Sequence, residues 1–220
     1  LISRLVAEVP SLKHSSSFHI VMCSVVPPLT DIVSQACSKL FNVEPLIIGR
    51  HIHPNISINY DAPKDVGTDR IVNALAAHSI YGQYNLIIVD LGTATVFDAI
   101  SKEGSYLGGA IAPGLALSSE ALFLKASQIK PVELVVPDRA IGQNTNSSVQ
   151  SGLIFGHSSL IEGMVDKFKQ ELGGTSKVIG TGGLLNHVLA CTSVFDIVDP
   201  NLAMEGLRIA LEHYDNPDNS

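Results

Sequence analysis

The 220-residue sequence lacks the features that mark several large classes of protein. It has no run of lysines and arginines and its net charge is −7, which argues against nucleic acid or an anionic membrane as its main partner. It has no apolar stretch of membrane-spanning length, and its first residues lack the basic segment and apolar run of a secretory signal. Its three cysteines, Cys23, Cys37 and Cys191, form no CxxC pair and lie in apolar contexts. These absences predict a cytoplasmic protein with reduced, buried thiols.

The composition is that of a globular protein. Hydrophobic residues make up 45% of the chain and charged residues 16%, a balance unlike that of a disordered protein. A chain of this length can bury a substantial core and form one large domain or two small lobes. Among the histidines, His51 and His53 have a weak metal-ligand spacing, but no cysteine or carboxylate lies close beside them. We therefore interpret this segment as a loop and not as a zinc site.

Strand-like and helix-like segments alternate, which predicts an α/β fold with a largely parallel sheet interrupted by a hairpin. Pro27-Pro28 is expected to end the first strand, and Thr30 to be the N-cap of the first helix. A lobe boundary at Tyr81-Gly82-Gln83 would divide the chain into residues 1–83 and residues 84–220. Later helices are expected at residues 69–80, 117–129, 145–172 and 202–212. Strands are expected at residues 19–26, 46–48, 86–89, 106–112, 178–180 and 195–198.

Residues 87–98 combine an apolar strand with an acid, a glycine turn and two hydroxyls. Because the strand would be buried, Asp90 emerges at its end with a fixed direction. Gly92 lets the backbone approach an anion closely, and Thr93 and Thr95 offer hydroxyl donors, which suits the phosphates of a nucleotide. Since an acid repels phosphate, Asp90 is expected to hold a cation or a cation-bound water. An ordinary β-hairpin with a glycine turn is the alternative interpretation.

A second segment, residues 66–71, places a glycine turn at the start of a helix. The free N–H groups and the positive end of the helix dipole point at whatever lies there. Asp69 and Arg70 at this position combine a proton acceptor with an anion-binding group. The alternative is an acid that only stabilises the helix dipole, an effect worth about 0.3–1 kcal/mol.

Weaker signals occur in the C-terminal half. Residues 108–114 carry almost no functional side chains, so they either pack tightly or let a ligand contact the backbone. Residues 180–183 form a glycine turn of a shape that suits an anion or nucleotide, although such turns are common. Thr145 is either the N-cap of the long helix or a ligand contact. Glycines at positions 152, 156 and 163 within that helix are expected to permit close packing against another element.

Taken together, these segments resemble the motifs of type III pantothenate kinases, in the same order along the chain. The resemblance runs from about Ile20 to Leu211. Its motifs are Ser24-Val-Val-Pro-Pro-Leu, Gly67-Thr-Asp-Arg-Ile-Val-Asn, Asp90-Leu-Gly-Thr-Ala-Thr, Leu107-Gly-Gly-Ala-Ile-Ala-Pro-Gly-Leu, Ile141-Gly-Gln-Asn-Thr, Gln150-Ser-Gly and Thr181-Gly-Gly-Leu. The resemblance implies the two-lobed actin/hexokinase/Hsp70-like (ribonuclease H-like) fold. It also implies ATP-dependent phosphorylation of pantothenate, the first step of coenzyme A synthesis, by a homodimer that uses Mg²⁺ and either K⁺ or NH₄⁺.

The resemblance also assigns roles on the substrate side. Asp69 resembles the catalytic base for the pantothenate hydroxyl. Gly67, Thr68 and Arg70 complete the substrate turn, and Tyr60 matches a substrate-contacting tyrosine. Thr145 resembles a substrate contact that is supplied at the dimer interface.

On the nucleotide side, Asp90 resembles the ligand of the monovalent cation, and Thr93 resembles an ATP contact. The other residues expected to bind the cofactor are Gly92, Gly182 and Gly183.

Two departures from the family pattern stand out. Val96 replaces a second threonine, which is expected to alter packing more than chemistry. The family's opening strand, Asp-x-Gly-Asn-Thr, supplies the other phosphate turn and a metal-positioning acid, and it is absent from the sequence. We therefore expect a truncated N-terminal lobe and no kinase activity from the 220 residues alone.

Two other functions fit part of the pattern. A non-catalytic nucleotide-binding regulator on the same fold could lack the opening motif, but a regulator needs no base, and Asp69, Asp90 and Thr145 are all present. Another small-molecule kinase of the superfamily, acting on a sugar or on acetate, explains the nucleotide motifs but not the segment from Gly67 to Asn73.

Overall fold

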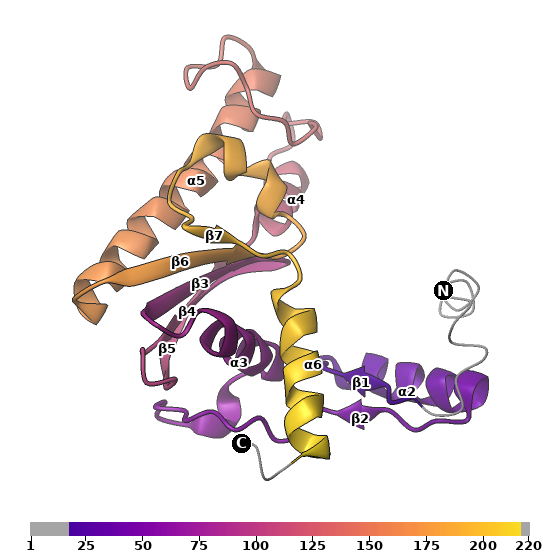
Figure 1. The fold of residues 1–220 in the computed structure, drawn as a ribbon. Coiled ribbons are helices and arrows are strands. Elements are labelled where there is room, and N and C mark those ends of the chain that lie inside the picture. Colours follow the sequence, from indigo (N-terminus) through magenta and orange to yellow (C-terminus); the bar gives the residue numbers. More distant parts are fainter. Residues whose placement is uncertain (1–17, 217–220) are drawn as a thin grey trace.

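The computed structural model describes residues 18–216 (Figure 1). The helices of this part of the chain are α2 (Pro27–Phe41), α3 (Thr68–Tyr81), α4 (Leu115–Lys125), α5 (Thr145–Leu172) and α6 (Leu202–Asp215). The strands are β1 (Val21–Met22), β2 (Leu46–Ile47), β3 (Asn85–Leu91), β4 (Ala94–Ile100), β5 (Tyr106–Pro113), β6 (Ser176–Thr181) and β7 (Ile197–Val198). Short 3-10 turns lie at Pro63–Asp65, Leu185–His187 and Leu189–Cys191.

The main sheet has the strand order β5-β4-β3-β6-β7. Its central strand, β3, is antiparallel to β4 and parallel to β6, and β6 is parallel to β7. The sequence predicts one hairpin in a largely parallel sheet. The hairpin of β3 and β4 is present, but the prediction is wrong for β5, which also runs antiparallel to β4. The connection between them is a tight turn in which Ser101 N donates to Ser105 O at 2.8 Å, and parallel pairing would need a much longer crossover. A separate small sheet pairs β1 with β2 in parallel.

Both faces of β3 are covered by a helix. Alternate residues of a strand point to opposite faces, so Leu86 and Ile88 pack in the cluster that contains the alanines of α3. Ile87 and Val89 pack in the cluster that contains the apolar residues of α5. Figure 1 shows α3 and α5 on opposite sides of the sheet. This double coverage explains the unbroken apolar run of β3.

Helix α3 packs on its other side against α6. The cluster between them contains Val72 and Leu75 of α3 with Ile209 and Ala210 of α6, and β1 and β2 add partly buried residues to it. Gly206 of α6 lies directly against the backbone of Val72. The two helices therefore lie between the main sheet and the small β1–β2 sheet (Figure 1).

The structure corrects the predicted start of the first helix. Helix α2 begins at Pro27 with Val26 as its N-cap, so the proline pair occupies the first turn. Proline fits there because the first N–H groups of a helix have no acceptor within the helix and its φ is already helical. Thr30 is therefore inside α2 and not its cap. Its hydroxyl lies 2.7 Å from Ser24 Oγ and 3.1 Å from Val26 O.

The bounds of α5 agree with the prediction, but its N-cap is Asn144. The Asn144 side chain accepts from Ser147 N at 2.9 Å, and Ser147 Oγ accepts from Asn144 N, which completes a capping box. Thr145 is thus the first helical residue, and capping does not use its side chain. Helix α4 ends at Lys125, before the predicted end at residue 129.

The glycines within α5 do not pack against another element of the described chain. Apart from the backbone of its own helix, a Cβ added at Gly152, Gly156 or Gly163 would have no atom within 4 Å. The expectation of close packing inside this chain is therefore wrong. The three positions are exposed, and their spacing places them on one side of the helix.

Three smaller predictions concern the cysteines, the histidine pair and the membrane. Cys37 is buried, whereas Cys23 and Cys191 are only partly so, and all three are free thiols. His51 accepts a hydrogen bond from Ile47 N at 2.9 Å through Nδ1, and residues 18–216 contain no group of three potential metal ligands. No helix within the same residues combines the length and apolarity needed to cross a membrane.

We predict that Gly206→Ala lowers the free energy of unfolding by about 1–3 kcal/mol, the usual cost of overpacking. The added methyl group would collide with the Val72 carbonyl, so α6 would have to move away from α3. Urea or thermal unfolding measures the effect. Ala203→Ser, at an exposed position of α6, is the control and should change stability by less than about 0.5 kcal/mol. A Gly206→Ala protein as stable as the wild type would contradict the close crossing of the two helices.

Candidate functional site

The first turn of α3 presents a carboxylate to solvent. Gly67 is the N-cap and makes no side-chain capping bond, so backbone N–H groups at this end have no side-chain acceptor from the cap. Asp69 is exposed, and its Oδ1 accepts from Arg70 N at 2.9 Å. A Cβ at Gly67 would lie 2.5 Å from that same oxygen. Glycine at position 67 therefore lets the Asp69 carboxylate fold over the turn.

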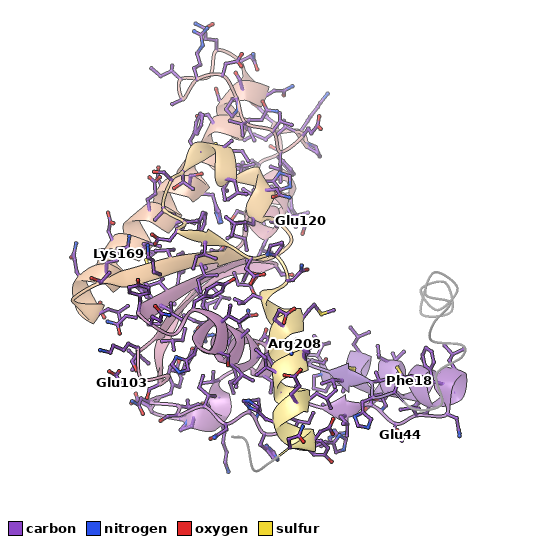
Figure 2. The ribbon with its side chains drawn as sticks, viewed as in Figure 1. Phe18, Glu44, Glu103, Glu120, Lys169 and Arg208 are labelled. Atoms are coloured by element: carbon purple, nitrogen blue, oxygen red, sulfur yellow. The ribbon has the colours of Figure 1, made fainter. Side chains whose placement is uncertain are left out.

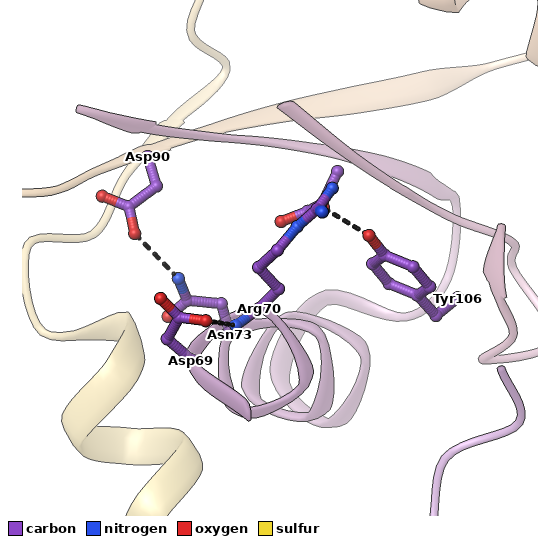
Figure 3. A network of polar contacts seen from close by, with 6 residues as sticks. Asp69, Arg70, Asn73, Asp90 and Tyr106 are labelled. Carbon is purple, nitrogen blue, oxygen red and sulfur yellow. Dashed lines mark hydrogen bonds and ion pairs between the residues drawn. The ribbon is translucent and has the colours of Figure 1, made fainter. Parts of the chain in front are cut away.

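A second carboxylate lies close to this turn, at the end of β3. Asp90 Oδ2 accepts from Asn73 Nδ2 at 3.1 Å, and Asn73 lies one helical turn after Asp69 on α3 (Figure 3). Burial raises the pKa of Asp90 above its ordinary value, the Asn73 bond lowers it in part, and the charge of Asp69 raises it further. Asn73 Oδ1 is buried and has no hydrogen-bond partner among residues 18–216. The half-buried carboxylate of Asp90 therefore lies beside the side-chain carbonyl oxygen of Asn73, which has no hydrogen-bond partner among the described residues.

Two glycine turns meet beside Asp90. β3 and β6 are parallel neighbours with Asp90 opposite Thr181, so the turns that follow them leave the sheet at one edge. Gly182 has a φ of 95° and approaches Asp90 closely, because a Cβ there would lie 2.5 Å from Asp90 Oδ1. Glycine at position 182 thus fits both the backbone conformation and the close approach. The structure brings the two predicted phosphate turns together.

A cavity of about 310 Å³ opens beside the first of these turns. Thr93 is exposed there, and α4 forms the opposite wall through residues that include Glu120, labelled in Figure 2. The lining consists of Gly92, Thr93, Ala116, Leu117, Glu120 and Leu184. The cavity is open, and its place beside the glycine turns suits part of a nucleotide.

An ion pair holds the side chain of Arg70. Asp98 of β4 is buried, and its Oδ1 lies 2.7 Å from Arg70 Nη2 and accepts from Arg70 Nε at 2.9 Å. The Tyr106 hydroxyl of β5 donates to the same oxygen at 2.8 Å (Figure 3). Burial raises the pKa of Asp98, and the charge and hydrogen bond of Arg70 oppose this rise. The ring of Tyr60 lies 6.3 Å from that of Tyr106, so the predicted substrate tyrosine is part of the same group.

Thr145 lies apart from these residues. Figure 1 places the N-terminal end of α5 at the far end of the molecule from α3. Thr145 is exposed at that end. Within one chain, the predicted residues thus form one group around Asp69, Asp90 and Arg70, from which Thr145 is separate.

Sequence reasoning missed Asn73, Asp98 and Tyr106 as members of this group. Asn73 could have been predicted from the sequence, because it lies four residues after Asp69 and therefore on the same face of the helix. Asp98 had another, since an acid within the apolar run of β4 must be paired to be buried at acceptable cost. Tyr106 carried no comparable signal, because its role depends on the register of β4 against β5.

Comparisons with known proteins support the resemblance that these motifs indicate. Residues 3–167, more than half of the chain, match the family model described as type III pantothenate kinase. A type III pantothenate kinase of Syntrophus aciditrophicus is 46% identical over 191 residues, which cover 87% of this chain and 75% of that protein. One of Moorella thermoacetica is 42% identical over 212 residues, which cover 96% of this chain and 83% of that protein.

Among solved structures, a Campylobacter jejuni protein assigned to the Baf family of transcriptional activators aligns with a TM-score of 0.60. The alignment covers 95% of this chain and 88% of that chain at 21% identity, so it supports the fold alone. The predicted α/β fold is confirmed. Given the family-model match and relatives more than 40% identical over most of both chains, this chain belongs to the type III pantothenate kinase family.

Proposed function

We propose that the full-length protein acts as its family does and transfers the γ-phosphate of ATP to the hydroxyl of pantothenate, the first step of coenzyme A synthesis. The observation that carries this proposal is the convergence of the family's motifs. The substrate turn of α3 and the nucleotide turns after β3 and β6 meet where Asn73 bonds to Asp90. Phosphoryl transfer requires mainly that the two substrates be placed in line and that charge be compensated, which this arrangement suits.

Asp69 is the proposed general base. Its carboxylate is exposed at the N-terminal turn of α3, where a substrate hydroxyl can reach it. Its one described bond, from Arg70 N to Oδ1, orients the group and leaves Oδ2 to accept a proton. Gly67, Thr68, Arg70 and Tyr60 are the proposed substrate contacts, with Arg70 as the cationic member.

The nucleotide is proposed to lie along the turn of Gly92 and Thr93, with its phosphates toward Gly182 and Gly183. The residues at Asp90 fit a cation, because a half-buried carboxylate and the unsatisfied Asn73 carbonyl are oxygen ligands without a positive partner among the described residues. Asp90 and Asn73 are therefore the proposed ligands of a monovalent cation, K⁺ or NH₄⁺. A cation there would offset the charge of the phosphates. Mg²⁺ usually needs only one or two carboxylates besides the phosphates, which Asp90 could supply in part.

We further propose that the active form is a homodimer in which Thr145 completes the substrate site of the other subunit. Thr145 is exposed and remote from the α3 turn of its own chain. The exposed glycines of α5 would let a second copy of that helix approach closely. We also propose that the chain forms two lobes, residues 1–83 and 84–220, and that the protein is cytoplasmic.

The first test replaces the base. Asp69→Asn in the full-length protein should lower kcat by about 10²–10⁴-fold, the usual effect of losing a general base, with little change in the KM of either substrate. The amide keeps the size of the side chain but cannot accept the proton. Coupled ADP-release assays with pantothenate measure both constants. Asp65→Asn, in the exposed turn before α3, is the control and should behave as wild type. Near wild-type turnover by Asp69→Asn would remove Asp69 from the catalytic role.

The second test concerns the cation. If Asp90 binds a monovalent cation beside the phosphates, replacing K⁺ by Na⁺ should lower the kcat/KM for ATP in the full-length protein. Asp90→Asn removes the negative ligand and should abolish the difference between the two ions. Titrations of activity against each salt at constant ionic strength separate this effect from screening. Equal activity of the wild type in both salts would argue against a monovalent-cation site.

The third test concerns the dimer. Gly156→Arg should convert the dimer to a monomer in size-exclusion chromatography with light scattering, and circular dichroism should be unchanged. Because a Cβ at this position meets no atom within 4 Å, the isolated subunit has room for the side chain. Ala203→Arg, at an exposed position of α6, is the control and should remain dimeric. A Gly156→Arg protein that is still dimeric would place the interface elsewhere.

A further inference from the structure

Asp98 is a buried acid in a strand that otherwise consists of apolar and hydroxyl residues. Its side chain is 1% exposed, and a carboxylate in such a place is costly unless it is paired and hydrogen-bonded. The pairing is concentrated on one atom, Oδ1, which is bonded by Arg70 and by the Tyr106 hydroxyl. These donors come from α3 and β5, so the acid links the first turn of α3 to two strands of the sheet.

The ion pair fixes the orientation of Arg70. A guanidinium has five N–H donors in a rigid planar fork, and here Nε and Nη2 both face Asp98. The arginine lies over the face of Tyr106, with Cζ 5.6 Å from the ring centroid. Nη2 lies 2.7 Å from Asp98 Oδ1, but it is buried and makes no hydrogen bond among residues 18–216. The guanidinium is thus held by the Nε hydrogen bond and by the charge of Asp98, and it retains N–H donors for a ligand.

The absence of a side chain at Gly109 leaves room for the ion pair of Arg70 and Asp98. It lies opposite Asp98 in the register of β4 and β5. A Cβ at this position would collide with Phe97 O of β4, and it would lie 2.5 Å from Arg70 Nη2 and 2.8 Å from Asp98 Oδ1. Any larger residue would therefore disturb both the backbone of β4 and the ion pair. This gives a physical reason for a glycine in the segment that carries few functional side chains.

Stability alone is a weak reason for such a pair. Taking two charges out of water costs about as much as their attraction returns, and apolar residues of the same volume often stabilise a protein better. The pair does, however, hold a cation next to the residue proposed as the base, since Arg70 follows Asp69 directly in the chain. An arginine that is oriented before the ligand arrives loses less side-chain freedom when it binds an anion.

We propose that Asp98 is a positioning residue that, together with the Tyr106 hydroxyl, orients Arg70 to bind an oxyanion of the substrates. This inference rests on the proposed function and adds a residue to it. The oxyanion is either the carboxylate of pantothenate or a phosphate of ATP. Both are recognised by a guanidinium in the same way, through paired N–H donors.

The test compares Asp98→Asn with wild type in the full-length protein. Kinetic constants are measured for pantothenate, for ATP and for the alcohol analogue of pantothenate, in which CH₂OH replaces the carboxylate. Asp98→Asn should raise one KM by about 10- to 100-fold, as expected for weakened bonds from a charged donor, with kcat within about 3-fold of wild type. A rise for pantothenate but not for its alcohol assigns Arg70 to the carboxylate. A rise for ATP assigns it to a phosphate.

Further variants separate positioning from a general structural role. Arg70→Gln should raise the same KM, and adding Asp98→Asn to it should have no further effect, because both changes remove one interaction. Tyr106→Phe keeps the ion pair and should raise the same KM by a smaller factor than Asp98→Asn does. It tests the proposal even if Asp98→Asn fails to fold. Asp196→Asn is the matched control. Asp196 accepts from Lys177 Nζ at 2.9 Å away from the site, and its loss should leave every KM unchanged.

The proposal is overturned if Asp98→Asn and Tyr106→Phe lower kcat/KM equally for pantothenate and its alcohol with no change for ATP. It is also overturned if no KM changes, or if the effects of Asp98→Asn and Arg70→Gln multiply. These outcomes leave pantothenate phosphorylation intact. A wild-type protein that does not phosphorylate pantothenate overturns the proposed function and this inference with it.

Discussion

The packing of α3 on the centre of the main sheet is the interaction on which the candidate site depends. The buried face of α3 carries Ala74, Ala76 and Ala77, whose small side chains let the helix lie close to β3. This closeness brings Asn73 within reach of Asp90 and lets Arg70 reach Asp98 on the next strand. On the opposite side, contact with α6 keeps the helix in place. The chemistry of the α3 turn therefore depends on apolar contacts that carry no chemistry themselves.

Three carboxylates surround this helix, and their environments differ. Asp98 is buried and paired with a guanidinium, Asp90 is half-buried and bonded to a neutral amide, and Asp69 is exposed and bonded to a backbone N–H. These environments suit three tasks. A paired, buried acid can hold an arginine, an acid without a cationic partner can attract a metal ion, and an exposed acid can accept a proton. The same residue type thus supports different roles because burial and partners differ.

The sequence predicted the parts of this arrangement that depend on local pattern. The bounds of α5, the hairpin after Asp90 and the turn before α3 follow from periodicity, glycine and polar residues within a few positions of one another. The second antiparallel pairing, that of β5 with β4, was not predicted, because alternating strand-like and helix-like segments favour parallel pairing. Asp98 and Tyr106 were missed for a different reason. Their partner, Arg70, is far away in sequence, and only the register of the strands brings them to it.

If the α3 turn and the nucleotide turns form one phosphoryl-transfer site, both substrates must meet between them. The most direct measurement is a crystal structure of the full-length protein with pantothenate and a non-hydrolysable ATP analogue. The pantothenate hydroxyl should lie within hydrogen-bond distance of Asp69, about 2.6–3.2 Å, with the γ-phosphate between that hydroxyl and the turn of Gly92 and Thr93. A pantothenate hydroxyl bound away from Asp69, or a γ-phosphate that points away from that hydroxyl, would show that the turns do not form one site.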